Sequence, residues 1–326
     1  MLDAQSASAK TYAAALRAAF RAYRLSRFAA QDHLFQQRPD GGAVVFDREH
    51  VAANLLIPPF ADAQDRQRII DLIAPAQRHR HFGSMQSSQA LAQSVFGTIA
   101  ILNRLPLISD VVAEDGRAAF GPELRASKVE LEKEIQTLGE PRKTSVDVWL
   151  DGPYRVAVEC KLSEPEFGAC SRPRLRPDNP AYAMQYCDGT YTRQRGRTAR
   201  CPLTTIGVRY WDHATGLFGW PSDTDHRPCP LASTYQIVRN VLAVCVDETG
   251  SVDVQRGHAL ILYDARNPTM LPGGEGDRQW RAASSALTVP ALLRRLSWQA
   301  FISQWPSDSV LDWLRDELDA KYGFCT

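Results

Sequence analysis

The segment Thr144–Leu162, TSVDVWLDGPYRVAVECKL, constrains the fold of this chain more than any other stretch. Apolar and polar residues alternate on both sides of Gly152–Pro153, and alternation with a period of two is typical of β-strands. Gly and Pro together favour a tight turn between two such strands. The segment therefore predicts a β-hairpin.

The register of this hairpin brings charged residues together. A three-residue loop at 152–154 places Asp147 directly opposite Glu159, with Cβ atoms about 5 Å apart. Residues two apart on a strand share a face, so Lys161 points the same way as Glu159. Two carboxylates at this distance repel each other unless a cation lies between them. We therefore expect Asp147 and Glu159 to bind Mg²⁺ (or Mn²⁺), with the backbone carbonyl of Cys160 as a further ligand.

The same charges could instead form an ordinary exposed ion pair, which is worth less than about 1 kcal/mol. Val156, Val158 and Leu162 favour a central strand, however, where an unpaired charge would be costly. A metal-dependent hydrolytic site is therefore the preferred interpretation. In such a site the ion lowers the pKa of a bound water, and Lys161 stabilises the charge that develops on a phosphoryl group.

An Asp on one strand and Glu-x-Lys on the next resembles the PD-(D/E)XK nuclease superfamily, which has the restriction-endonuclease-like fold. Asp147, Glu159, Cys160 and Lys161 match its D…E-x-K motif, while Val146 stands where many members have Pro. The wider run ECKLSEPEFGACSRPRL is similar to a small group of restriction endonucleases. The resemblance implies a Mg²⁺-dependent DNA endonuclease of restriction or defence type.

The resemblance also implies an α/β (α+β) fold with the element order αβββαβ and a mixed central sheet flanked by helices. The hydrophobic pattern predicts the matching elements in order: a helix at 87–104, a strand at 128–135, the hairpin, a helix from Ser233 to Val246, and a short strand at 260–263.

We expect a nuclease core at 84–265 that carries an inserted polar segment at 164–230. Extra helices are expected at both ends, in an N-terminal extension at 1–83 and a C-terminal extension at 266–326. The pattern of the C-terminal extension predicts two helices, at about 289–304 and about 308–322.

Further polar residues are candidates for the site. In the superfamily a helix before the sheet sometimes contributes a polar residue, which makes Gln89 a catalytic candidate. Glu130 or Glu132 on the strand at 128–135 could reach the metal, although such runs of Glu are often simply solvated. The basic cluster at 78–81, Arg-His-Arg-His, is interpreted as a surface loop, with DNA contact or metal binding as alternatives.

The inserted segment 164–230 is the one strongly basic part of a chain whose net charge is only +1. Nucleic-acid affinity must therefore come from a local patch. Neutralising backbone phosphates supplies much of the affinity for a duplex, so we expect this segment to contact DNA rather than to be a solvated flexible insertion. The candidate contact residues are Arg172, Arg174, Arg176, Arg193, Arg195 and Arg197.

The same segment contains Cys170, Cys187, Cys201 and Cys229. Four thiols in a polar segment could bind a structural zinc ion or an iron–sulfur cluster, although the usual C-x₂-C pair is missing. Unrelated free cysteines are the alternative. The odd total of seven Cys argues against a disulfide framework.

No run of 18 apolar residues and no signal peptide is present, so we expect a cytoplasmic protein without a membrane partner. A homodimer is possible, because cutting both strands can require two sites. A non-catalytic nucleic-acid-binding protein on an inactive nuclease scaffold is the alternative function.

Overall fold

The computed structural model describes residues 2–37, 42–122, 124–141 and 144–325. At its centre lies a five-stranded sheet with the order β1-β2-β3-β4-β5. β1, β2 and β3 pair in antiparallel fashion, whereas β3 pairs with β4, and β4 with β5, in parallel fashion. The strands are β1 (Lys128–Ile135), β2 (Thr144–Asp151), β3 (Arg155–Cys160), β4 (Gly257–Tyr263) and β5 (Leu293–Ser297). The expected mixed sheet is confirmed.

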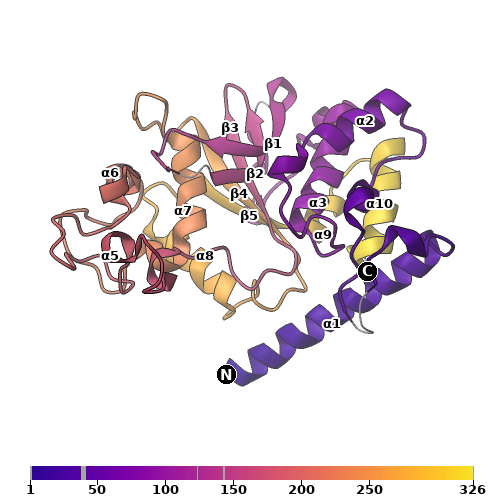
Figure 1. Ribbon diagram of the computed structural model, residues 1–326. Helices are drawn as coiled ribbons and strands as arrows, with labels where there is room; N and C mark the ends of the chain where they lie inside the picture. Colours follow the sequence, from indigo (N-terminus) through magenta and orange to yellow (C-terminus); the bar gives the residue numbers. More distant parts are fainter. Residues whose placement is uncertain (1, 38–41, 123, 142–143, 326) are drawn as a thin grey trace.

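Helices flank the sheet in two groups (Figure 1). One group comprises α1 (Leu2–Arg27), α2 (Ala63–Asp71), α3 (Ser88–Ala92), α4 (Thr98–Ile101), α9 (Trp298–Ser303) and α10 (Ser309–Tyr322). A π-helical turn, Gln93–Gly97, joins α3 to α4. The other group comprises α5 (Tyr182–Gln185), α6 (Tyr210–Leu217), α7 (Leu231–Cys245) and α8 (Glu275–Ala286).

Short 3₁₀ turns complete the secondary structure. They are Asp32–Leu34, Arg48–Asn54, Pro75–Gln77, Leu105–Ile108, Leu124–Ala126, Arg172–Arg174, Thr204–Ile206 and Pro290–Leu292.

Two hydrophobic cores lie on opposite faces of the sheet. Successive strand residues point to opposite faces, so Val148 and Val158 join the core under α3, α9 and α10, while Trp149 and Ala157 join the core under α7. Burial of each such large apolar side chain contributes about 1.5–3 kcal/mol. The helical segment 88–101 and α7 thus pack on opposite faces of the hairpin. The elements follow the expected αβββαβ order.

The hairpin has the register expected from the sequence. Val148 pairs with Val158 and Leu150 with Val156. Asp147 and Glu159 are each the next residue beyond the pair of Val148 and Val158, and the charge of Glu159 acts on Asp147. On the other side of β2, Leu131 pairs with Val148, so Glu132 lies opposite Asp147. Three carboxylates therefore lie in a row across β1, β2 and β3.

The terminal extensions are not independent of this core. The phenolic group of Tyr23 on α1 donates a 2.9 Å hydrogen bond to Glu317 on α10, and the rings of Phe20 and Tyr322 pack edge to face. The helix expected at about 289–304 is wrong in its first half, because residues 293–297 form β5 and the helix begins only at Trp298. The run LLRRLS has good helix formers, but pairing with β4 overrides this propensity.

Two other helices differ from expectation. α8, which runs from Glu275 to Ala286, is a helix that the sequence did not predict. α7 begins at Leu231 rather than after Ser233, and the hydroxyl of Thr234 bonds the carbonyl of Pro230 instead of a Ser233 cap.

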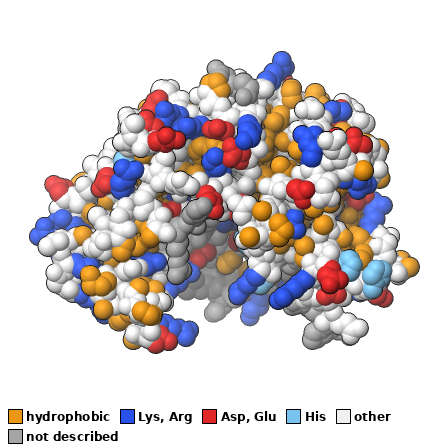
Figure 2. Space-filling model, turned by 45° about the horizontal axis from the view of Figure 1, so that its top comes forward, with side chains coloured by type: hydrophobic (Ala, Val, Ile, Leu, Met, Phe, Trp, Pro, Cys, Tyr) orange, Lys and Arg blue, Asp and Glu red, His pale blue; other side chains and the backbone are white. Residues whose placement is uncertain are grey.

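The inserted segment 164–230 is packed rather than solvated. Phe167, Tyr191, Trp211 and Phe218 are all buried and belong to the core on the α7 face. Figure 2 shows acidic and basic side chains interspersed over the visible face, in keeping with a net charge of +1. None of the helices in the described ranges has the length and apolar character needed to cross a membrane.

Candidate active site

The row of carboxylates on the sheet is electrostatically coupled. Burial raises the pKa of Asp147 well above its ordinary value, and the charges of Glu159 and Glu132 raise it further. The backbone N–H of Cys160 opposes this by donating a 2.7 Å hydrogen bond to Asp147 Oδ2. A cation nearby would therefore stabilise the ionised form of Asp147.

Glu159 is held by helix α7. Its side chain is buried, with the residue 3 % exposed, and both carboxylate oxygens have partners. Gln236 Nε2 donates to Oε1 at 2.7 Å, and Asn240 Nδ2 donates to Oε2 at 2.9 Å. Arg239 Nη2 lies 3.8 Å from Oε2. Burial raises the pKa of Glu159, but Lys161 and Arg239 outweigh it, so the pKa lies below its usual value.

Lys161 completes the cluster from β3. Its Nζ lies 2.9 Å from Glu159 Oε1 and 3.0 Å from Gln236 Oε1. Burial lowers the pKa of Lys161, but the nearby charges of Glu159, Glu164 and Asp147 outweigh it and raise the pKa to about 12. Lys161 is therefore a fixed cation at neutral pH and cannot act as a general base there.

Glu132 is the residue that the sequence only partly indicated. It has φ +52°, a left-handed conformation that costs a non-glycine residue about 1–3 kcal/mol. The hydroxyl of Ser145 donates to its Oε2, while its Oε1 is buried without a hydrogen-bond partner. A strained residue that carries an unsatisfied carboxylate oxygen, and whose charge acts on Asp147, is typical of a functional position. Glu130, by contrast, pairs with Lys128 and Lys133.

The donor set fits a hard divalent cation. Asp147 and Glu132 offer carboxylate oxygens where negative charge exceeds positive charge, and Mg²⁺ prefers one or two carboxylates with several waters. Among the residues that the structure describes, no three His, Cys, Asp or Glu side chains are already grouped as a complete metal site. An ion here would accordingly take most of its ligands from water and substrate. The Cys160 carbonyl stays a predicted ligand.

Gln89 is not part of this site, contrary to expectation. Its side chain is buried and binds the loop that precedes the helix, with Oε1 accepting from the His79 backbone at 2.9 Å and Nε2 donating to the Gln77 carbonyl at 3.2 Å. The neighbouring Ser88 reaches toward the site instead, because its hydroxyl donates a 2.6 Å hydrogen bond to Glu164. The sequence predicted that Gln89 would serve the site. Its neighbour Ser88 contacts Glu164 instead, because adjacent residues of a helix point in different directions.

A cavity of about 530 Å³ lies beside the end of the Glu-x-Lys strand. Ser163 and Glu164 line it from the loop that follows β3, and His79, Arg80 and His81 line it from the loop before α3. The basic cluster at 78–81 is thus a surface loop, as expected, and its side chains face a hollow that adjoins Glu164.

The predicted arginines are spread along the inserted segment. Arg174 forms a 2.9 Å ion pair with Glu166, and the guanidinium of Arg195 lies over the rings of Tyr182 and Tyr186. Arg172 bonds Gln185, and Arg197 donates to the Met184 carbonyl at 3.3 Å. Arg176 and Arg193 are exposed. None of these contacts tests DNA binding, which stays a prediction for all six residues.

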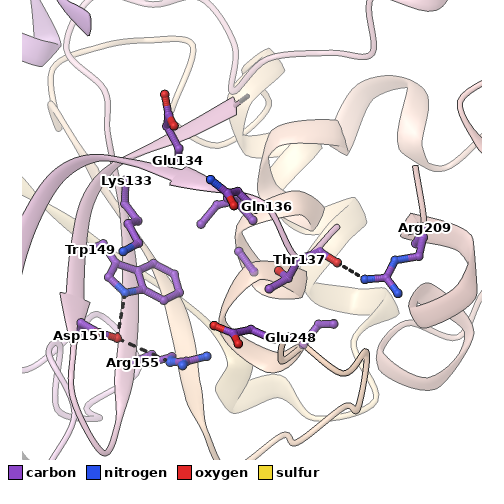
Figure 3. A pocket seen from close by; sticks show the side chains of 12 residues that line it. Lys133, Glu134, Gln136, Thr137, Trp149, Asp151, Arg155, Arg209 and Glu248 are labelled. Carbon is purple, nitrogen blue, oxygen red and sulfur yellow. Dashed lines mark hydrogen bonds and ion pairs between the residues drawn. The ribbon is translucent and has the colours of Figure 1, made fainter. Parts of the chain in front are cut away.

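A second cavity, of about 510 Å³, lies farther along the sheet and does not include the carboxylate row. Figure 3 shows Trp149, Asp151 and Arg155 on one side of it, with Arg209 and Glu248 on the other. The Trp149 indole donates to Asp151 at 3.2 Å. Asp151 also lies 3.7 Å from Arg155, so the acidic group between these residues already has a cation, and we place the candidate chemistry at the carboxylate row.

Comparison with known proteins identifies a family for this chain. A family model described as Restriction Endonuclease associating with ARP, REase-ARP, matches residues 21–323. No curated protein and no solved structure matched the chain.

Proposed function

We propose, on the premise that this chain belongs to the restriction-endonuclease family REase-ARP, that it is a divalent-metal-dependent nuclease that cuts DNA internally. The observation that carries the proposal is the row Glu132, Asp147 and Glu159, with Lys161 beside it. A buried group of like charges is costly unless a cation or substrate chemistry makes use of it.

The residues divide the work according to their surroundings. Asp147 and Glu132 have the oxygens that would hold Mg²⁺ or Mn²⁺, and Glu159 would be a further ligand once it exchanges one of its present partners. Such an ion, when bound, supplies a water of lowered pKa and neutralises phosphoryl charge. Lys161, a permanent cation, orients the nucleophile and stabilises the negative charge that develops on phosphate.

Substrate would approach from the side where the inserted segment begins. Exposed Arg176 and Arg193, and Arg174 once it leaves Glu166, would contact phosphates, and His79 and Arg80 line the cavity next to Glu164. These contacts would fix the position of the backbone without reading its sequence. A role in restriction or defence against foreign DNA follows from the family and is part of the proposal.

The test is incubation of the purified chain with supercoiled plasmid in Mg²⁺, in Mn²⁺ and in EDTA. The proposal predicts conversion to nicked and linear forms with either ion and none in EDTA. A plasmid that stays supercoiled with both ions, at protein concentrations that shift its mobility, would contradict it.

One observation favours a second function. Both oxygens of Glu159 are already occupied by Gln236, Asn240 and Lys161, as they would be in an inactive scaffold that only binds nucleic acid. That function predicts binding that survives EDTA and no metal-dependent product, so the same gel separates the two.

A further inference from the structure

Four cysteines far apart in the sequence meet at one place in the inserted segment. Cys170, Cys187, Cys201 and Cys229 all line one small cavity of about 20 Å³, which is large enough for one small group and little more. The first three are buried and Cys229 is partly buried. The other cysteines of the described chain, Cys160, Cys245 and Cys325, do not line it.

Each of these four thiols accepts a hydrogen bond from the backbone in the same way. Burial raises the pKa of each, while a hydrogen bond from the backbone N–H two residues farther along opposes this effect. The donors are Arg172 for Cys170, Gly189 for Cys187, Leu203 for Cys201 and Leu231 for Cys229. An N–H donor aimed at sulfur favours the thiolate form, which is the form that binds metals. Four repeats of this arrangement around one cavity are not expected of unrelated cysteines.

Backbone hydrogen bonds of two of the cysteines join the loops that surround the cavity. The Cys229 backbone donates to the Gly189 carbonyl at 2.8 Å, and the Cys170 backbone donates to the Ala232 carbonyl at 2.9 Å. The segment between them has only short helical turns, apart from α6. Loops of this kind often need a metal to offset the entropy of ordering them.

We propose that the four thiolates bind one thiophilic metal centre, either a zinc ion or an iron–sulfur cluster, that holds the inserted segment folded. Four cysteine ligands suit both groups. Among the described residues the four side chains do not yet form a complete metal site, so binding requires the four loops to adjust their positions.

The proposed metal centre also affects the position of the carboxylate row, because it lies at the start of α7, the helix that contacts Glu159. Cys229 precedes the first residue of α7 by two positions, and the Gln236 backbone donates to the Gly168 carbonyl at 3.2 Å. The same helix supplies Gln236 and Asn240 to Glu159. The metal centre therefore fixes the helix end that positions the candidate nuclease residues, without contacting them.

The test is elemental analysis of the purified full chain, with absorption spectra of samples prepared with and without oxygen. The proposal predicts about one zinc per chain, or iron and sulfide with the visible absorption of a cluster. The Cys201→Ser variant should lose most of this metal, whereas Cys325→Ser and the buried Cys245→Ala should retain it.

Because Cys201→Ser could fail to fold, a second measurement uses the unaltered chain. A thiol reagent should modify four more cysteines after treatment with a strong chelator than before it. A folded chain without zinc or iron, which also takes up neither on reconstitution under reducing conditions, would overturn the proposal. Metal content of a Glu159→Gln variant should match that of the unaltered chain, so the result is independent of nuclease activity.

Discussion

Gln236 on α7 donates a 2.7 Å hydrogen bond to Glu159 on β3, and its other amide atom accepts from Lys161 at 3.0 Å. One amide thus orients both charged residues of the Glu-x-Lys motif, although it lies 75 positions from the lysine in sequence. This makes α7 the element that positions the site, since Asn240 on the same helix binds the second oxygen of Glu159.

Gln236→Ala should slow Mg²⁺-dependent plasmid cleavage by about 10- to 100-fold, the usual loss when an outer partner of a ligand is removed. The effect should fall on the cleavage rate and on the Mg²⁺ concentration required, while DNA binding in EDTA changes little. Ser233→Ala on the same helix is the matched control. Equal rates for the two variants would show that the amide does not position the site.

Glu132→Gln should raise the Mg²⁺ concentration needed for half-maximal cleavage by about tenfold or more, because it removes a carboxylate next to Asp147. Its neighbour on the same strand, Glu130, pairs with two lysines, so Glu130→Gln serves as the control. A metal titration with unchanged midpoint in Glu132→Gln would remove this residue from the site.

Asp264→Ala should lower the free energy of unfolding by about 1–3 kcal/mol, because it leaves partly buried hydrogen-bond donors without their carboxylate. Asp264 is fully buried and binds Tyr12, Arg266 and Gln299, which come from three different parts of the chain. Urea unfolding measures the loss, and the exposed Asp223→Ala should cost little. A change below about 1 kcal/mol would contradict this account of the packing.

Acid should destabilise the fold through His258. Burial, aided by Arg294, lowers its pKa to about 3 from an ordinary value near 6.5. The unfolded chain therefore binds a proton that the folded chain does not, so stability is full above about pH 6.5 and falls toward about pH 3. Between about pH 7 and about pH 5 the loss should be about 2 kcal/mol.

Unfolding of His258→Phe should lack this part of the pH dependence, even if the variant is less stable at neutral pH. His81, whose ring is exposed, supplies the control His81→Gln. Parallel pH profiles for His258→Phe and the unaltered chain would show that His258 does not titrate on unfolding in this range.

The local pattern of the sequence predicted the hairpin and its register well, because both follow from alternation and a Gly-Pro turn within one short segment. β5 was missed because its Leu and Arg residues suit a helix equally well, and only pairing with the distant β4 decides between them. The prediction of secondary structure therefore failed where an element depends on a partner far away in the sequence, not where the local pattern is weak.

The candidate site shows the same limit. Asp147, Glu159 and Lys161 lie close together in sequence and were found, whereas Gln236 and Asn240 come from a helix whose polar residues face the sheet only in the folded chain. The sequence offered Glu130 and Glu132 as alternatives. The structure favours Glu132 because of its left-handed backbone conformation, which no sequence pattern indicates.

In the proposed site, Asp147 and Glu132 hold the ion that cuts DNA, Glu159 becomes a further ligand, and Lys161 assists. The most direct measurement is the single-turnover rate of plasmid cleavage in Mg²⁺ by Asp147→Asn, Glu159→Gln and Lys161→Met, together with DNA binding by each. We predict that each variant loses about 100-fold or more in rate while still binding DNA, and that the exposed Asp71→Asn behaves as the unaltered chain. Cleavage at the unaltered rate by Asp147→Asn or Glu159→Gln would contradict the account.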